Sequence, residues 1–121
     1  SPALFTIYLS HPYTGDEEKN RLIARRIAAR IVREYPGIAV VNPLDALHYA
    51  KMAELSYDKI LKIDIELLSR CDAVLVRGDW ERSIGCRREV QAAHERKIPV
   101  FWETLEPLLE LMGESAQKNA N

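Results

Sequence analysis

Short apolar runs alternate with longer amphipathic stretches along this chain. Four of the runs are rich in β-branched and aromatic residues and predict strands, at residues 4–9, 38–41, 72–76 and 98–102. The first is apolar at almost every position. A run of that kind is typical of a strand buried on both faces of a parallel sheet.

The stretches between these runs have the period of helices. In residues 16–35, Ile23, Ile27 and Ile31 recur every four positions, and Pro36 and Gly37 end the segment. Further helices are predicted at residues 57–71, 84–96 and 105–112. Strands separated by helices are parallel neighbours joined by right-handed crossovers.

This alternation predicts an α/β protein. We expect a three-layer α/β/α sandwich on a parallel sheet of four or five strands, flavodoxin-like or Rossmann-like, with strand order 2-1-3-4. Residues 1–112 are expected to form one domain, and the polar residues 113–121 a disordered tail.

In such sheets, the loops after the carboxyl ends of the strands form the ligand crevice. The loop after the first strand begins Ser10-His11-Pro12-Tyr13, so Ser10, His11 and Tyr13 are candidate ligand contacts. Thr14 or Asp16 can cap the helix that follows. Residues 44–56 allow a short helix, and we expect them to form a mobile cover over the crevice.

The loop after the third strand leads into Ser83-Ile84-Gly85-Cys86-Arg87-Arg88-Glu89. A helix start presents unpaired N–H groups and a partial positive charge, which suit a phosphate, and Glu89 would face another part of the same ligand. The alternative is that Ser83 is only an N-cap and that Glu89 only favours the helix dipole.

Asp64 interrupts an apolar helix face between Ile60 and Leu67. A carboxylate there costs several kcal/mol unless it is paired or hydrogen-bonded. Either it caps a loop or pairs with an arginine, or it is kept at the edge of the sheet for proton transfer, with a pKa raised by burial.

The 17 basic and 18 acidic residues give a net charge of −1, which argues against binding of nucleic-acid polymers or membrane surfaces. Five arginines, at positions 21, 25, 26, 30 and 33, fit a solvated helix face. Cys71 and Cys86 follow no metal-ligand or disulfide pattern. No apolar run approaches the roughly 20 residues of a membrane span, and no secretory signal is visible. We therefore expect a reduced, cytoplasmic protein without metal or cofactor.

Three motifs together resemble the nucleoside 2-deoxyribosyltransferase superfamily. They are the run Ile7 to Tyr13, Asp64 placed eight residues before Asp72, and Ser83-x-Gly85-x-x-x-Glu89. Within the superfamily the chain is most similar to the DUF4406 proteins, in which a Cys-Asp pair, a Trp and this last motif follow one another as Cys71-Asp72, Trp80 and Ser83 to Glu89 do here. The resemblance covers about residues 5 to 102.

Members of this superfamily cleave the N-glycosidic bond of deoxynucleosides or nucleoside monophosphates, passing the sugar to another base or to water. The resemblance implies that Glu89 is the nucleophile and that Asp64 manages the proton of the leaving base. It also implies that Tyr8, Ser10, His11, Tyr13, Ser83 and Gly85 bind the substrate.

Ser83 stands where the transferases that take free nucleosides carry Asp. This implies a 5′-phosphate, as in nucleoside 5′-monophosphate N-glycosidases. We expect His11, and either Arg82 or Arg87, to converge on the same helix start as further contacts. The sequence departs from these N-glycosidases at two places, so the identity of the substrate stays open. Ser10-His11 replaces their Gly-Ser pair after the first strand, and Arg87 replaces their second glycine between the serine and the glutamate.

The chemistry fits these residue types. An oxocarbenium-like transition state needs one carboxylate at the anomeric carbon and an acid for the departing base, and two acids in different environments can divide these roles. We therefore expect an enzyme, an N-glycosidase or deoxyribosyltransferase that acts on a small nucleotide.

Two alternatives remain. One is a non-catalytic nucleotide-binding module that senses or sequesters its ligand. The other is a response-regulator-like domain, which lacks support because an acidic pair after the first strand and a lysine after the last are missing. In either case, fold alone does not decide function.

A homodimer or homotetramer is expected, because related enzymes complete their sites with a neighbour's residues. In addition, Trp80, Tyr49 and Met52 lie in segments that a small sheet cannot easily cover.

Overall fold

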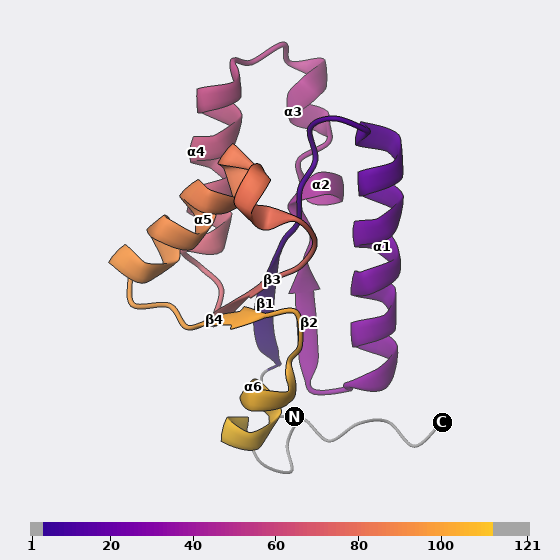
Figure 1. Cartoon of the computed structure of the whole chain (residues 1–121), viewed down its shortest axis with the longest axis vertical. Coiled ribbons are helices and arrows are strands. Elements are labelled where there is room, and N and C mark those ends of the chain that lie inside the picture. Colours follow the sequence, from indigo (N-terminus) through magenta and orange to yellow (C-terminus); the bar gives the residue numbers. More distant parts are fainter. Residues whose placement is uncertain (1–3, 113–121) are drawn as a thin grey trace.

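The computed structural model describes residues 4–112 and contains the predicted succession of strands and helices (Figure 1). In chain order the elements are β1 (Phe5–Ser10), α1 (Glu17–Glu34), β2 (Ile38–Val41), α2 (Pro43–Ala46), α3 (Tyr49–Met52), α4 (Tyr57–Leu68), β3 (Ala73–Val76), the 3₁₀ turn η1 (Trp80–Arg82), α5 (Ile84–Glu95), β4 (Val100–Trp102) and α6 (Glu106–Met112). The predicted tail, residues 113–121, lies outside the described residues.

The four strands form one parallel sheet in the order β2-β1-β3-β4, which confirms the predicted order with four strands. Ser10 lies beside Val76, and Val76 beside Trp102, so three strands end at the same edge. The chain changes its direction of winding between β1 and β3. The loops that follow these two strands therefore form the crevice at this edge.

The two faces of the sheet carry separate apolar clusters. On one face, Ile7, Leu9 and Leu75 pack against residues of α1 and α6. On the other, Tyr8, Val74 and Val76 pack against α4 and α5. Because successive strand residues point to opposite faces, each strand contributes side chains to both clusters. Figure 1 shows α1 on the opposite side of the sheet from α4 and α5, which is the predicted three-layer arrangement.

Local sequence explains the longest helix, α1. The Asp16 carboxylate accepts a hydrogen bond from the Lys19 N–H at 3.4 Å, so Asp16, and not Thr14, is the N-cap. Ala24 and Ile31 are the buried residues of its inner face. No helix between residues 4 and 112 combines the length and apolar character needed to cross a bilayer.

Residues 42–53, which we call the cover, form two one-turn helices rather than the single short helix that the pattern allowed. The Asn42 side chain accepts a hydrogen bond from the Leu44 N–H and Pro43 begins α2, so this turn is capped locally. Pro43, Leu47 and Ala50 are the buried residues of the cover.

One expectation about exposed apolar residues is wrong. Trp80 is half-buried, because its ring packs on that of Trp102 with the centroids 4.7 Å apart. Tyr49 and Met52 in the cover do stay exposed, at 61% and 84%.

Candidate active site

Glu89 is a buried carboxylate on α5, with an exposed fraction of 5%. The Tyr8 hydroxyl donates to Oε2, and the Ser10 hydroxyl donates to Oε1 at 2.7 Å. Tyr8 and Ser10 are two positions apart on β1, so both side chains point to the face that α5 covers. Two side chains on the same face of β1 thus bind both oxygens of the Glu89 carboxylate.

The environment of Glu89 tunes its charge. Burial raises the pKa of Glu89 to about 7, although the hydrogen bonds from Tyr8 and Ser10 favour the ionised form and lower it. The pKa of Tyr8 is raised well above its ordinary value by burial and by the neighbouring Glu89 charge. Tyr8 therefore remains a proton donor while Glu89 ionises near neutral pH.

Asp64 is the second carboxyl group of the site. It is half-buried on α4, and among residues 4–112 nothing forms a hydrogen bond or ion pair with its carboxylate. Burial, followed by repulsion from Glu89, raises the pKa of Asp64 to about 8. Among these residues the structure thus shows no loop or arginine partner that would support the alternative of a structural aspartate. With this pKa, Asp64 stays protonated near pH 7.

A cavity of about 190 Å³ lies at the carboxyl edge of the sheet. Its wall includes these predicted site residues: Glu89, Asp64, His11, Tyr13, Ser83 and Gly85. Tyr8 and Ser10 are fully buried. They bind the Glu89 carboxylate, and neither is part of the cavity wall.

The start of α5 has an N-cap residue and, beside it, N–H groups that remain free to bind a ligand. The Ser83 hydroxyl oxygen accepts a hydrogen bond from the Cys86 N–H at 3.1 Å, so Ser83 is an N-cap as the alternative stated. The first N–H groups of the helix still lack partners within the helix. At Gly85, an added Cβ would lie 2.9 Å from the Tyr57 hydroxyl, so only glycine lets Tyr57 lie close over this helix start.

His11 lies in the wall of the same cavity, but it does not carry the positive charge expected of a phosphate contact. Its Nδ1 is 2.8 Å from the Pro12 carbonyl oxygen, which can only accept a hydrogen bond, so the proton is on Nδ1. Burial lowers the pKa of His11. A neutral ring with an unprotonated Nε2 accepts hydrogen bonds, so His11 does not supply a positive charge to a phosphate at neutral pH.

The cover closes one side of the cavity, where Leu44, Leu47, His48 and Lys51 form part of the wall. This agrees with the expectation that residues 44–56 lie over the crevice. Besides its buried residues, the cover makes polar contacts with α1.

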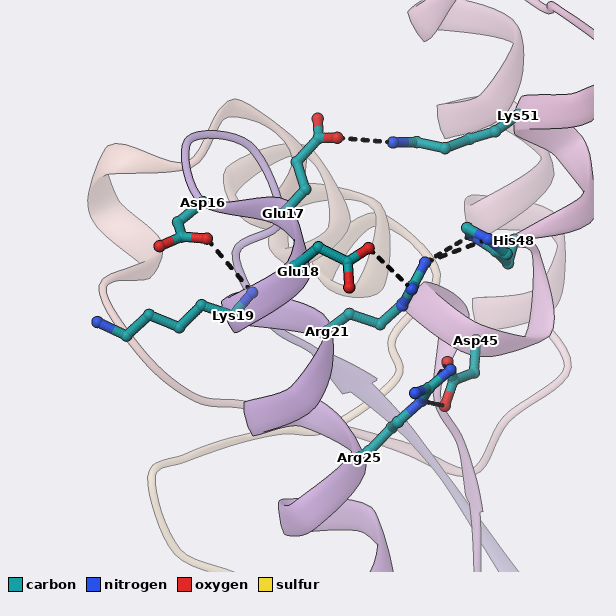
Figure 2. Close-up of polar contacts among 9 residues, drawn as sticks. All are labelled: Asp16, Glu17, Glu18, Lys19, Arg21, Arg25, Asp45, His48 and Lys51. Carbon is teal, nitrogen blue, oxygen red and sulfur yellow. Dashed lines mark hydrogen bonds and ion pairs between the residues drawn. The ribbon is translucent and has the colours of Figure 1, made fainter.

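Figure 2 shows three such contacts in a row. They are Arg25 Nε to both Asp45 oxygens at 2.8 Å, Arg21 Nη1 to the His48 ring at 3.0 Å, and Lys51 Nζ to Glu17 Oε1 at 2.9 Å. Arg25 is exposed, as expected of a solvated helix face, whereas the Arg21 side chain is only 15% exposed.

Lys51 also lies over the ring of Tyr13, with Nζ 4.2 Å from the ring centroid. This cation–π contact orients an aromatic side chain of the cavity wall. Exposed ion pairs each contribute only about 0–1 kcal/mol, so the cover is held to α1 by several weak contacts.

Sequence reasoning missed Glu17, Tyr57 and Cys86 in the wall. Cys86 had a usable signal, since it precedes Glu89 by three positions and so shares its helix face. Burial raises the pKa of Cys86 to about 11, which keeps it a neutral thiol. Between residues 4 and 112, no group of three His, Cys, Asp or Glu side chains is placed to hold a metal ion.

The fold is shared with known enzymes. A 2-deoxyribosyltransferase from Bacillus psychrosaccharolyticus matches with a TM-score of 0.55 and 20% identity, over 80% of this chain and 70% of that one. A 2-deoxyribosyltransferase from Leishmania mexicana matches with a TM-score of 0.57 and 16% identity, over 95% of this chain and 78% of that one. At these identities the likeness establishes the α/β fold and not the activity.

Sequence comparison gives a more specific result. No curated protein matches closely enough to count as a relative. The family described as "Domain of unknown function (DUF4406)" matches residues 5–102, which include every residue of the candidate site. The chain therefore belongs to the DUF4406 family.

Proposed function

We propose that the protein cleaves the N-glycosidic bond of a nucleoside or deoxynucleoside 5′-monophosphate, passing the sugar to water or to another base. The observation that carries the proposal is the buried Glu89 carboxylate, held by Tyr8 and Ser10 in the wall of a cavity that also contains Asp64. The fold shared with two 2-deoxyribosyltransferases supports it.

The two carboxyl groups suit the two halves of the reaction. A Glu89 oxygen forms a bond to the anomeric carbon while the C–N bond breaks. The electron pair of the C–N bond leaves with the base. The protonated Asp64 gives that base its proton. Water or a second base then attacks the same carbon, Asp64 takes up its proton, and the bond to Glu89 breaks. Tyr8 and Ser10 keep the carboxylate aligned throughout.

The 5′-phosphate would lie at the start of α5. The Ser83 hydroxyl can donate to a phosphate oxygen while its oxygen caps the helix, and the unpaired N–H groups of the first turn point the same way. Arg87 is exposed and is not part of the cavity wall, so its predicted phosphate contact has no support.

Monophosphates should accordingly bind more than about tenfold tighter than the matching nucleosides, since charge-assisted hydrogen bonds contribute about 1.5–3 kcal/mol each. The substitution Ser83→Asp separates the role of Ser83 in phosphate binding from its role as helix N-cap. Aspartate caps a helix as well as serine does, but its charge repels phosphate. In calorimetric titrations, this variant should lose the monophosphate preference and keep nucleoside binding. Equal affinity of the wild type for both ligands would remove the phosphate assignment.

We also propose a homodimer or homotetramer, supported by the exposed Tyr49 and Met52 in the cover. Burial of large apolar side chains drives association. Light scattering at micromolar concentration should give at least twice the monomer mass, and replacing both residues with Asp should reduce it to the monomer. A monomeric wild type would contradict this proposal.

A further inference from the structure

A second, wider depression adjoins the candidate active site. The two share four wall residues, His11, Thr14, Tyr57 and Ser83. The depression continues from Ser83 over the loop after β3 and the first two turns of α1. It is thus an open extension of the cavity on the side where the 5′-phosphate is proposed to bind.

The wall of this depression is positively charged. Lys19 from α1 and Arg82 from η1 contribute to it, against a single acid, Asp79. Arg82 Nε lies 3.4 Å from an Asp79 oxygen, while within residues 4–112 the Lys19 ammonium has no ion-pair partner. His11 adds no charge near neutral pH, because burial lowers its pKa. The depression therefore offers one positive charge more than its own acid balances.

Lys19 is directed away from the cover. Figure 2 shows its side chain leaving α1 on the side opposite to Glu17, Lys51 and His48. The cations of the cover and those of the second depression therefore belong to different walls.

The loop that carries Arg82 is held close to the cavity. Gly78 has a φ of +81°, and a Cβ there would lie 3.1 Å from Pro12 Cδ and 3.3 Å from His11 Nε2. This glycine lets the loops after β1 and β3 pack directly together. Arg82 is therefore carried on a wall fixed to the sheet, next to Ser83.

From this geometry we propose that the depression binds a second phosphate, so that the site takes nucleoside 5′-diphosphates as well as monophosphates. The inference rests on the proposed function, because it starts from a first phosphate at Ser83. The depression that continues from Ser83 is lined by Lys19 and Arg82. The β-phosphate adds negative charge on that side, where two cations and one acid line the wall.

The test is calorimetric titration of the wild-type protein with matched nucleosides, monophosphates and diphosphates, without divalent cations. At low salt, the diphosphate should bind about three- to tenfold tighter than the monophosphate, the gain expected of two exposed charge pairs. Raising the salt concentration should shrink this gain, since exposed charges are screened.

A double variant, Lys19→Ala with Arg82→Ala, should abolish the gain, so that monophosphate and diphosphate bind it with equal affinity. The matched control is Lys62→Ala with Arg70→Ala, which removes the same two charge types from α4 and the turn after it. Neither residue lies in either wall, so the control should keep the gain.

Each other outcome overturns the inference in a distinct way. Equal affinity of the wild type for mono- and diphosphate overturns it and leaves the proposed function in place. An equal loss of both affinities in the Lys19 and Arg82 variant also overturns it, because these cations would then serve the first phosphate. Absence of binding by any nucleotide would overturn the proposed function and the inference together.

Discussion

Glu89→Gln is expected to lower the rate of base release by at least about a thousandfold while nucleotide binding persists. The amide keeps the size of the side chain and can still accept a hydrogen bond from Tyr8 or Ser10. It cannot supply the negative charge or form the bond to the anomeric carbon. The measurement is chromatography of bases released from a panel of nucleoside monophosphates, with thermal unfolding recorded for each variant.

The matched control is Asp58→Asn. Asp58 is an exposed acid on α4 that pairs with Arg88 of α5 at 3.1 Å, so its loss changes the same pair of helices outside the cavity wall. It should leave the rate nearly unchanged. Release by Glu89→Gln at the wild-type rate would rule out Glu89 as nucleophile. A wild type that binds nucleotides without releasing base would support the non-catalytic module.

Asp64→Asn should slow base release by about a hundredfold or more, the usual contribution of a general acid. The effect should be largest for bases that leave reluctantly, because these depend most on protonation. Rates for a series of bases with different leaving ability test this. A uniform loss across the series would contradict the assignment of Asp64 as the proton donor.

The same substitution should stabilise the protein at alkaline pH. An aspartate in the unfolded chain has a pKa of about 4, whereas burial raises the pKa of Asp64 to about 8 in the folded state. Between these values the unfolded chain has lost a proton that the folded state retains, so stability falls as the pH rises. Asparagine carries no charge and avoids this loss.

Denaturant unfolding should therefore show Asp64→Asn more stable than the wild type at pH 8.5, by about 1–3 kcal/mol, and nearly equal to it at pH 4. A variant that is less stable than the wild type at both pH values would mean that Asp64 has a structural partner. An opposite change in activity and stability is typical of a strained functional group.

The alternation of apolar runs and amphipathic stretches determined the layers and the strand order. These features depend on period and on connection rules that each segment carries by itself. The same local logic singled out Asp64, since a carboxylate inside an apolar stripe is visible without knowing its neighbours. Ser83 and Glu89 were found because a strand, a loop and a helix start follow one another in the chain.

Contacts between distant segments were decided only by the tertiary structure. Tyr8 and Ser10 became supports of Glu89 because α5, about 80 positions further on, packs on their face of the sheet. Arg21 and Arg25 bind the cover because α2 and α3 fold back onto α1. His11 is neutral because burial lowers its pKa, and its contact with Pro12 places the proton on Nδ1. Lys19 and Arg82 share one wall because β1 and β3 end side by side. Sequence period determines which side of a segment is buried, whereas the identity of the facing residue depends on how the segments pack.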